Sequence, residues 1–219
     1  MNKPLAIDYY NDILCVWAWI AERRNEELVD QWAGKIDLHP RFINLFGDTQ
    51  SRMENQWADR GGYEGFAKHV LESAAPYDNA PVHPDIWKTV RPTSSANAHL
   101  ILKAAEKIYS KEQVVSFSRA IRHGFFVETR DIGKVQILQE IAGECGLDPR
   151  ALVKALEDGT ASAALMRDYQ MAHELHIKGS PTWIMNSGRQ ILFGNVGFRV
   201  LNANIREILE HPDLEASWC

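Results

Sequence analysis

The order in which strand and helix patterns follow one another limits the fold of this chain more than any other feature of its sequence. Residues 4–9 form a short apolar run typical of a buried strand, and residues 15–33 carry apolar side chains at helical spacing. In residues 36–46, apolar and polar side chains alternate as in a second strand. Two strands joined by a helix are usually parallel. Because Pro40 cannot donate to a strand ladder, we predict that the second strand lies at an edge or contains a bulge.

The middle of the chain, residues 48–158, has a helical pattern. Breaks are expected at residues 61–62, 76–84 and 91–92, where glycine and proline gather. The clearest helix is predicted over residues 94–109, where serine precedes an amphipathic run rich in alanine and leucine.

The pattern changes again near the end of the sequence. Residues 182–185 and 190–193 are short apolar strands, and the Asn-Ser-Gly-Arg stretch at 186–189 predicts an antiparallel hairpin. A last helix is expected over residues 200–209. The chain is therefore predicted to be an α/β protein of the order βαβ, helical block, αββα.

Composition and charge exclude several classes of function. The 219 residues carry a net charge of −5 without a dense Lys/Arg run, so no nucleic-acid partner is expected. A membrane span needs about 18 uncharged apolar residues, and no window approaches that, so no membrane partner is expected. The first residues lack the apolar segment of a secretion signal, and three cysteines leave at least one unpaired. We therefore expect a cytoplasmic protein.

Cys15 is the first candidate for chemistry. It lies where a strand ends and a helix begins, so free backbone N–H groups and the helix dipole would stabilise its thiolate. A lowered pKa and raised reactivity are expected there. The alternative is that Cys15 is a small buried apolar residue, as most free cysteines are.

A second candidate lies at Ser180-Pro181, between a helix and a strand. Proline here either ends the helix or forms a cis peptide bond. A cis bond would present the backbone of Ser180 beside the Cys15 sulfur, where an extended peptide could add as a strand.

Four stretches resemble the DsbA family, a thioredoxin fold with an inserted helical domain. Residues 8–19 (Asp-Tyr-Tyr-Asn-Asp-Ile-Leu-Cys-Val-Trp-Ala-Trp) match its first strand and active site, and residues 179–182 (Gly-Ser-Pro-Thr) match its cis-proline loop. Residues 98–100 and 124–132 match its insert.

The resemblance implies a thioredoxin-like domain over residues 1–47 and 159–219, with residues 48–158 inserted. It extends to the 2-hydroxychromene-2-carboxylate isomerases and kappa-class glutathione transferases.

One departure from the family pattern affects the chemistry. Ala18 stands where the second active-site cysteine would be, so no neighbouring thiol can resolve a mixed disulfide. The first hypothesis is a thiol–disulfide oxidoreductase that works through Cys15 alone, with an external thiol such as glutathione as co-substrate. No bound cofactor is expected. The substrate would be a thiol or disulfide, in a peptide or a small molecule, and the sequence is compatible with a homodimer.

Two alternatives come from other classes of protein. A glutathione-dependent isomerase or transferase would need an acidic residue near position 196, where the chain has Val196, although Asn195 could still donate hydrogen bonds. A peptide-binding module without catalysis would explain the loss of the second cysteine equally well.

The expected site residues fall into two groups. Cys15 is the expected catalytic residue, and substrate is expected to contact Trp17, Ser180 and Pro181. Four further residues are expected to line the pocket: Tyr10, Ala18, His99 and Asn195.

The remaining cysteines and histidines give little evidence of a functional role. Cys145 is expected to pack inside the helical block, and Cys219 receives no role. His173 and His176 are three residues apart, which does not fit the spacing of a zinc-protease helix, so no metal is expected.

Overall fold

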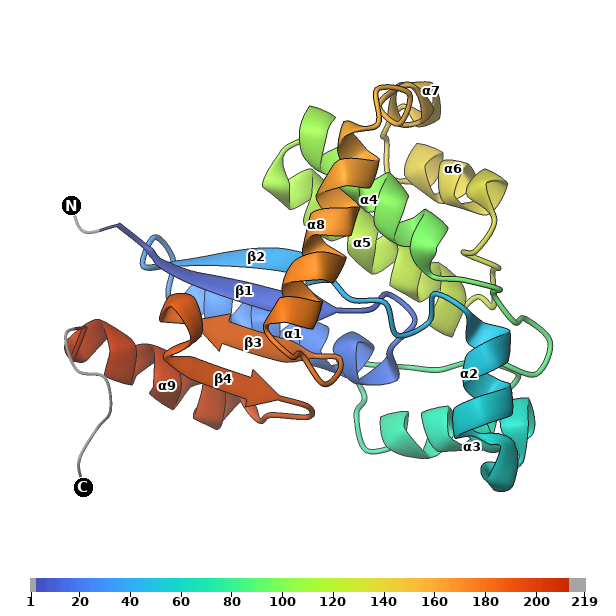
Figure 1. Ribbon diagram of the computed structural model, residues 1–219, viewed down its shortest axis with the longest axis horizontal. Coiled ribbons are helices and arrows are strands. Elements are labelled where there is room, and N and C mark those ends of the chain that lie inside the picture. Colours follow the sequence, from blue (N-terminus) through green and yellow to red (C-terminus); the bar gives the residue numbers. More distant parts are fainter. Residues whose placement is uncertain (1–2, 213–219) are drawn as a thin grey trace.

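The computed structural model describes residues 3–212, which form a four-stranded sheet surrounded by helices (Figure 1). The elements follow in the order β1 Leu5–Asn11, α1 Val16–Gln31, β2 Ile36–Phe42, α2 Thr49–Gln56, a 3-10 turn Ala58–Arg60, α3 Gly62–Ala74, α4 Ala96–Ile108, α5 Lys111–Phe126, α6 Val135–Glu144, α7 Pro149–Lys154, α8 Thr160–Glu174, β3 Thr182–Met185, a 3-10 turn Asn186–Gly188, β4 Gln190–Phe193 and α9 Phe198–Glu210.

The sheet has the strand order β2-β1-β3-β4. Strands β1 and β2 are parallel, with Tyr9 opposite Pro40, which confirms the βαβ prediction. Strand β2 is an edge strand, so the prediction from Pro40 is also confirmed. Strand β3 pairs antiparallel with both β1 and β4.

Strand β2 ends at Phe42 and does not continue to residue 46 as predicted. The reason is a competing hydrogen-bond acceptor. The backbone N–H groups of Leu45 and Phe46 donate to the buried carboxylate of Asp12, at 3.1 and 3.0 Å, and so turn away from the sheet.

Helices cover both faces of the sheet (Figure 1). On one face, the β1 side chains of Leu5, Ile7 and Tyr9 form a core with residues of α1 and α9. On the other face, Tyr10 and Ile184 pack against Ala172 of α8. This alternation along β1 follows from the pleat of a strand, in which successive side chains point to opposite faces.

The helical block contributes the largest core, and that core is continuous with the Cys15 loop. Ile13, Leu14, Cys15 and Val16 belong to the same cluster as Phe66, Phe117 and Phe125. The predicted break at residues 61–62 is confirmed, since α3 begins at Gly62 after Gly61 adopts a φ of 88°. The domain boundaries at 47/48 and 158/159 stay a prediction.

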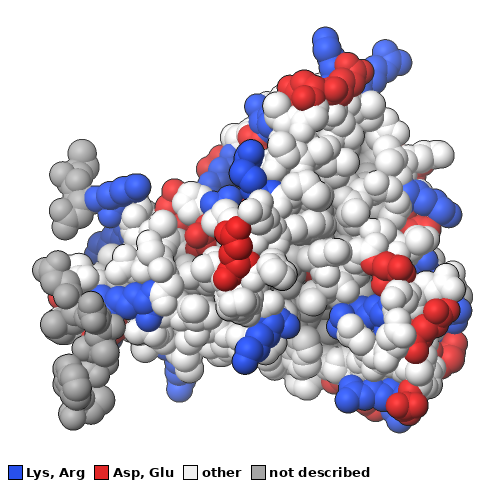
Figure 2. All heavy atoms as spheres, in the orientation of Figure 1, with Lys and Arg blue, Asp and Glu red and all other residues white. Residues whose placement is uncertain are grey.

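The surface carries mixed charge. On the face shown in Figure 2, Lys and Arg are interspersed with Asp and Glu and do not gather into one basic area. Among residues 3–212, no helix has the length and apolar character needed to cross a membrane.

Candidate functional site

Cys15 lies at the junction of β1 and α1, where the sequence placed it. It occupies the position before the first helical residue, and its carbonyl accepts hydrogen bonds from the N–H groups of Ala18 and Trp19, both at 3.1 Å. Its thiol donates to the carbonyl oxygen of Ser180, with 3.4 Å between sulfur and oxygen. The fold therefore brings the two candidate segments together across 165 positions of sequence.

The turn opposite Cys15 is held by its own hydrogen bonds. The Ser180–Pro181 peptide bond is cis. The Ser180 hydroxyl accepts from the N–H of Asp12 at 3.1 Å, and the Thr182 hydroxyl donates to the carbonyl of Gly179 at 2.8 Å. The first bond ties the turn to the loop that precedes Cys15, and the second closes the turn on itself.

Asp12 connects this loop to the helical block, and sequence reasoning missed it as a site residue. Its carboxylate is fully buried and accepts from the Leu14 N–H at 3.0 Å, the Ser95 hydroxyl at 2.9 Å and two N–H groups of the chain after β2. The available signal was a carboxylate three residues before a helix-opening cysteine. Four donors offset the cost of burying the charge.

His99 is a satisfied core histidine that supports the same loop. Its Nε2 accepts from the N–H of Ile13 at 3.1 Å, so Nδ1 carries the proton and donates to the Tyr169 hydroxyl at 2.9 Å. The ring is fully buried and stacks on Phe42. Burial lowers the pKa of His99 to about 4, so the ring is neutral near pH 7.

The expectation of a lowered thiol pKa at Cys15 is wrong for this conformation. Cys15 is only 7% exposed, and this burial raises its pKa above the ordinary value. The side chain of Ser180 and the backbone N–H groups of Ala18 and Trp17 lower the pKa, but by less. Desolvation outweighs the stabilising effect of the helix terminus because the thiol is enclosed in the main core.

Arg52 of α2 brings a positive charge to this region, and sequence reasoning missed it. Its guanidinium lies over the ring of Phe46, 4.7 Å from the centroid, and donates to the carbonyl of Leu45 at 3.4 Å. Its charge interacts with Cys15 and with Asp12. The Nε atom is buried and has no hydrogen-bond partner among the described residues.

Trp17 and Ala18 have different surroundings. Trp17 is partly buried and lies edge-on to His69, which in turn contacts Trp57 of the segment between α2 and α3. Trp17 is therefore half-buried among aromatic side chains, and its place at the substrate rim and its contact with substrate stay predictions. Ala18 is fully buried within the main core.

The other predicted residues lie elsewhere. Tyr10 packs beneath α8, with its hydroxyl buried and without a hydrogen-bond partner among residues 3–212. The side chain of Asn195 is exposed and donates to the Tyr77 hydroxyl at 2.6 Å. Cys145 is exposed, so the expectation that it packs inside the helical block is wrong: it caps the exposed end of α6 before Gly146. Cys219 lies outside the described residues.

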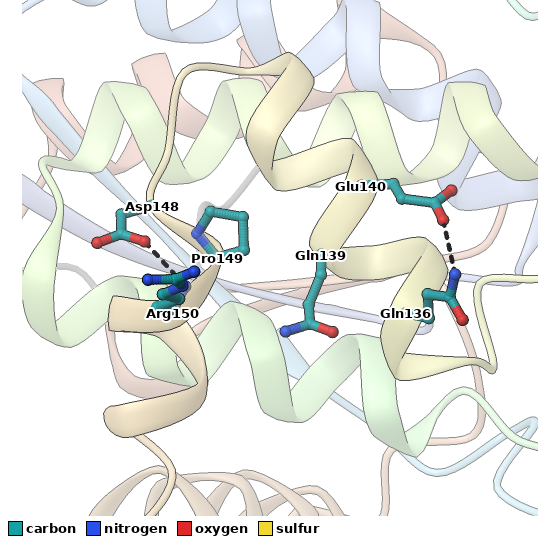
Figure 3. A pocket seen from close by; sticks show the side chains of 6 residues that line it. All are labelled: Gln136, Gln139, Glu140, Asp148, Pro149 and Arg150. Atoms are coloured by element: carbon teal, nitrogen blue, oxygen red, sulfur yellow. Dashed lines mark hydrogen bonds between the residues drawn. The ribbon is translucent and has the colours of Figure 1, made fainter.

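Two hollows have defined linings, and Cys15 is not among the residues of either. One lies between α6 and α7 and is lined by Gln136, Gln139, Glu140, Asp148, Pro149 and Arg150 (Figure 3). Its side chains hydrogen-bond to their own neighbours, as Gln136 does to Glu140 at 3.2 Å. The other, of about 460 Å³, lies between α1, the sheet, α4 and α5.

Comparison with known proteins gives a family and several relatives. The model of the DSBA-like thioredoxin domain matches residues 6–206. The ClpXP adapter protein SpxH of Halalkalibacterium halodurans is 28% identical over 188 residues. That match covers 84% of this chain but only 59% of the relative.

Solved structures with similar folds cover nearly the whole chain. A Nitrosomonas europaea protein assigned as a disulfide isomerase superimposes with a TM-score of 0.78 and 15% identity, over 95% of this chain and 98% of that one. The cytosolic disulfide reductase DsbM from Pseudomonas aeruginosa gives 0.68 and 21% over the same shares, and it has also been solved with GSH. A 2-hydroxychromene-2-carboxylate isomerase gives 0.66 and 14%, over 97% and 100%.

Proposed function

Because the chain belongs to the family of DsbA-like thioredoxin domains, with the thioredoxin-like fold of that family, we propose that it is a thiol–disulfide oxidoreductase working through Cys15 alone. The observation that carries the proposal is the contact between the Cys15 sulfur and the carbonyl of Ser180. This contact places the thiol beside a backbone group to which an extended substrate could bind.

The reaction has two steps of thiol–disulfide exchange. The Cys15 thiolate attacks one sulfur of a substrate disulfide, which forms a mixed disulfide and releases the other sulfur as a thiolate. Since Ala18 offers no second thiol, the thiolate of an external molecule such as glutathione then attacks the mixed disulfide and regenerates Cys15. In the net reaction one substrate disulfide is broken and one new disulfide forms. The new disulfide joins the external thiol to the substrate sulfur, or joins two external thiols when a second one reacts.

Several residues support this chemistry in the proposal. The backbone of Trp17 and Ala18 stabilises the thiolate, and Arg52 adds a positive charge. Trp17 contacts the apolar part of the substrate. Because only 7% of Cys15 is exposed, we expect exchange to be slow near pH 7 unless the substrate itself widens the opening.

The test is glutathione-dependent reduction of a small disulfide such as 2-hydroxyethyl disulfide. Wild type should show activity that Cys15→Ser abolishes. Cys145→Ser is the matched control, since Cys145 is an exposed cysteine far along the chain, and it should retain the activity. No exchange by wild type between pH 7 and pH 9.5, or full exchange by Cys15→Ser, would contradict the proposal.

A second candidate is a binding module without thiol chemistry. The burial of Cys15 and its raised pKa favour this reading, and the curated relative is described as an adapter protein. Extended peptides would then add beside Ser180 and Pro181. Fluorescence anisotropy with a library of labelled peptides separates the candidates. Binding that survives in Cys15→Ser, in a protein whose wild type shows no exchange, favours the module.

The third candidate function, a glutathione-dependent isomerase or transferase, has the weakest support. The 2-hydroxychromene-2-carboxylate isomerase shares the fold at 14% identity, but position 196 is apolar and the side chain of Asn195 is bound to Tyr77. Calorimetry that detects no glutathione affinity removes this candidate. Location in the cytoplasm is likewise part of the proposal, supported by the cytosolic DsbM among the similar structures.

A further inference from the structure

The cavity of about 460 Å³ between α1 and α5 is separate from the Cys15 contact. It is bounded by β1 and β2 on the inside and by α1, α4 and α5 around it. Its volume lies within the range of small-molecule sites. Neither Cys15 nor Pro181 is among its lining residues, and nothing in the proposed thiol chemistry uses it.

The walls of this cavity are largely apolar. The apolar side chains that line it are Val29, Leu38, Phe42, Leu102, Val114 and Val115. Two of them, Val29 and Val115, are 44% and 45% exposed and come from facing helices, α1 and α5. Exposed apolar side chains at the rim of a partly enclosed cavity favour an apolar ligand body over water.

Polar groups with unused hydrogen-bonding capacity line the same cavity. Glu22 and Arg122 form an ion pair at 2.5 Å through one oxygen and one terminal nitrogen. The second Glu22 oxygen, the Arg122 Nε and the Tyr9 hydroxyl are buried and have no hydrogen-bond partner within the described chain. Tyr9 and Arg122 are each only 4% exposed. Buried polar atoms are normally paired, so the two unpaired oxygens, on Glu22 and Tyr9, point to a ligand group that donates hydrogen bonds.

The charges of the lining residues determine which charge the polar group of the ligand should carry. The lining contains five carboxylates but three cationic side chains. Three of the acids, Glu22, Glu26 and Asp30, lie at successive turns of α1, one above the other on one side of the helix. Arg119 pairs with both Glu22 and Glu26, and Glu106 pairs with Lys103, which is not a lining residue. Asp30 forms no ion pair within the described residues. The excess of negative charge favours a cation and disfavours an anion.

We propose that this cavity binds a small amphipathic amine, with its apolar body against the valine and leucine walls and its ammonium group bonded to Glu22 and the Tyr9 hydroxyl. An ammonium group has three donors and no acceptor, which matches a carboxylate oxygen and a hydroxyl oxygen that accept no hydrogen bond within the described chain. The site is independent of the proposed exchange reaction.

The experiment compares three probes that share a phenylbutyl body. The probes are 4-phenylbutylamine, 4-phenyl-1-butanol and 4-phenylbutyrate, titrated by calorimetry and by protein NMR. We expect the amine to bind about tenfold more tightly than the alcohol, and the carboxylate to bind more weakly still. Val115→Trp should fill the cavity entrance and weaken amine binding about tenfold or more.

Matched variants keep the test decisive. Val135→Trp, at a valine that is 41% exposed on α6, should bind the amine as wild type does. Cys15→Ser should also bind normally. If Val115→Trp fails to fold, Val29→Trp on the facing helix replaces it. Equal binding of amine and carboxylate, no amine binding at millimolar concentration, unchanged binding by the folded tryptophan variants or loss of binding in Cys15→Ser would each overturn the proposal.

Discussion

Acidification should destabilise this protein through His99. Burial lowers the pKa of the folded-state imidazole from 6.5 to about 4, so the unfolded chain binds a proton at this residue before the folded chain does. A group whose pKa is lowered by folding in this way contributes stability that is present above the unfolded value near 6.5. That contribution decreases as the pH falls toward 4, and below this value both states are protonated and the loss levels off.

The size of the effect follows from these two pKa values. Between pH 7 and pH 4.5 the linkage relation gives a loss of about 2.5 kcal/mol from His99 alone. The Ile13 N–H is part of the cause, because its hydrogen bond to Nε2 requires an unprotonated nitrogen. Other groups titrate over the same range, so the measurement must isolate this residue.

A difference between two proteins isolates it. Urea unfolding, followed by tryptophan fluorescence at steps between pH 7 and pH 4.5, gives the free energy of unfolding of wild type and His99→Gln. Glutamine does not titrate, so the wild type should lose about 2.5 kcal/mol more than the variant over this range. His173→Gln, at an exposed histidine, should follow the wild-type curve. Parallel curves for wild type and His99→Gln would refute the reasoning.

Three further predictions concern the Cys15 loop. Asp12→Asn should lower the free energy of unfolding by about 3 kcal/mol in urea titrations, because an amide cannot accept from all four donors. The control Asp48→Asn, at an exposed helix cap, should lower it by less than about 1 kcal/mol. Equal losses in the two variants would contradict the argument. Alkylation of Cys15 by iodoacetamide, measured by peptide mass spectrometry, should rise steeply with pH through 9, since burial raises the pKa of the thiol; a plateau below pH 8 would contradict this. Ala18→Cys lies one helical turn from Cys15 and should form a disulfide with it on oxidation. Ala21→Cys is equally buried but lies one turn further along α1 and should not. A disulfide to Cys15 in both variants would contradict the predicted position of residue 18.

Local periodicity was sufficient to predict the elements that form the sheet. The βαβ start and the C-terminal hairpin follow from patterns a few residues long, and the element order then predicts that Cys15 meets Ser180. The end of β2 could not be predicted in this way. It depends on a carboxylate 33 and 34 positions earlier in the chain, at Asp12, which accepts the N–H groups of Leu45 and Phe46.

The protonation behaviour of Cys15 was equally inaccessible to sequence patterns. A helix terminus is visible in the sequence, but the enclosure of the thiol depends on a core shared with residues of α2, α3 and α5, which is a tertiary property. The same applies to Arg52, whose position over Phe46 is set by the turn after β2. Sequence patterns thus located the Cys15 thiol and misjudged its solvation.

The hydrogen bonds that meet at Asp12 have a consequence for how the molecule unfolds. The same carboxylate holds the loop before α1 and the Ser95 hydroxyl at the start of α4, and Ile13 of that loop is bonded to His99 in the next turn. Deleting residues 48–158 would remove the core that Ile13, Leu14 and Val16 share with the helices, and it would remove the Ser95 hydroxyl from the Asp12 carboxylate. Sheet and helical block are therefore one cooperative unit, and denaturation should proceed in a single transition.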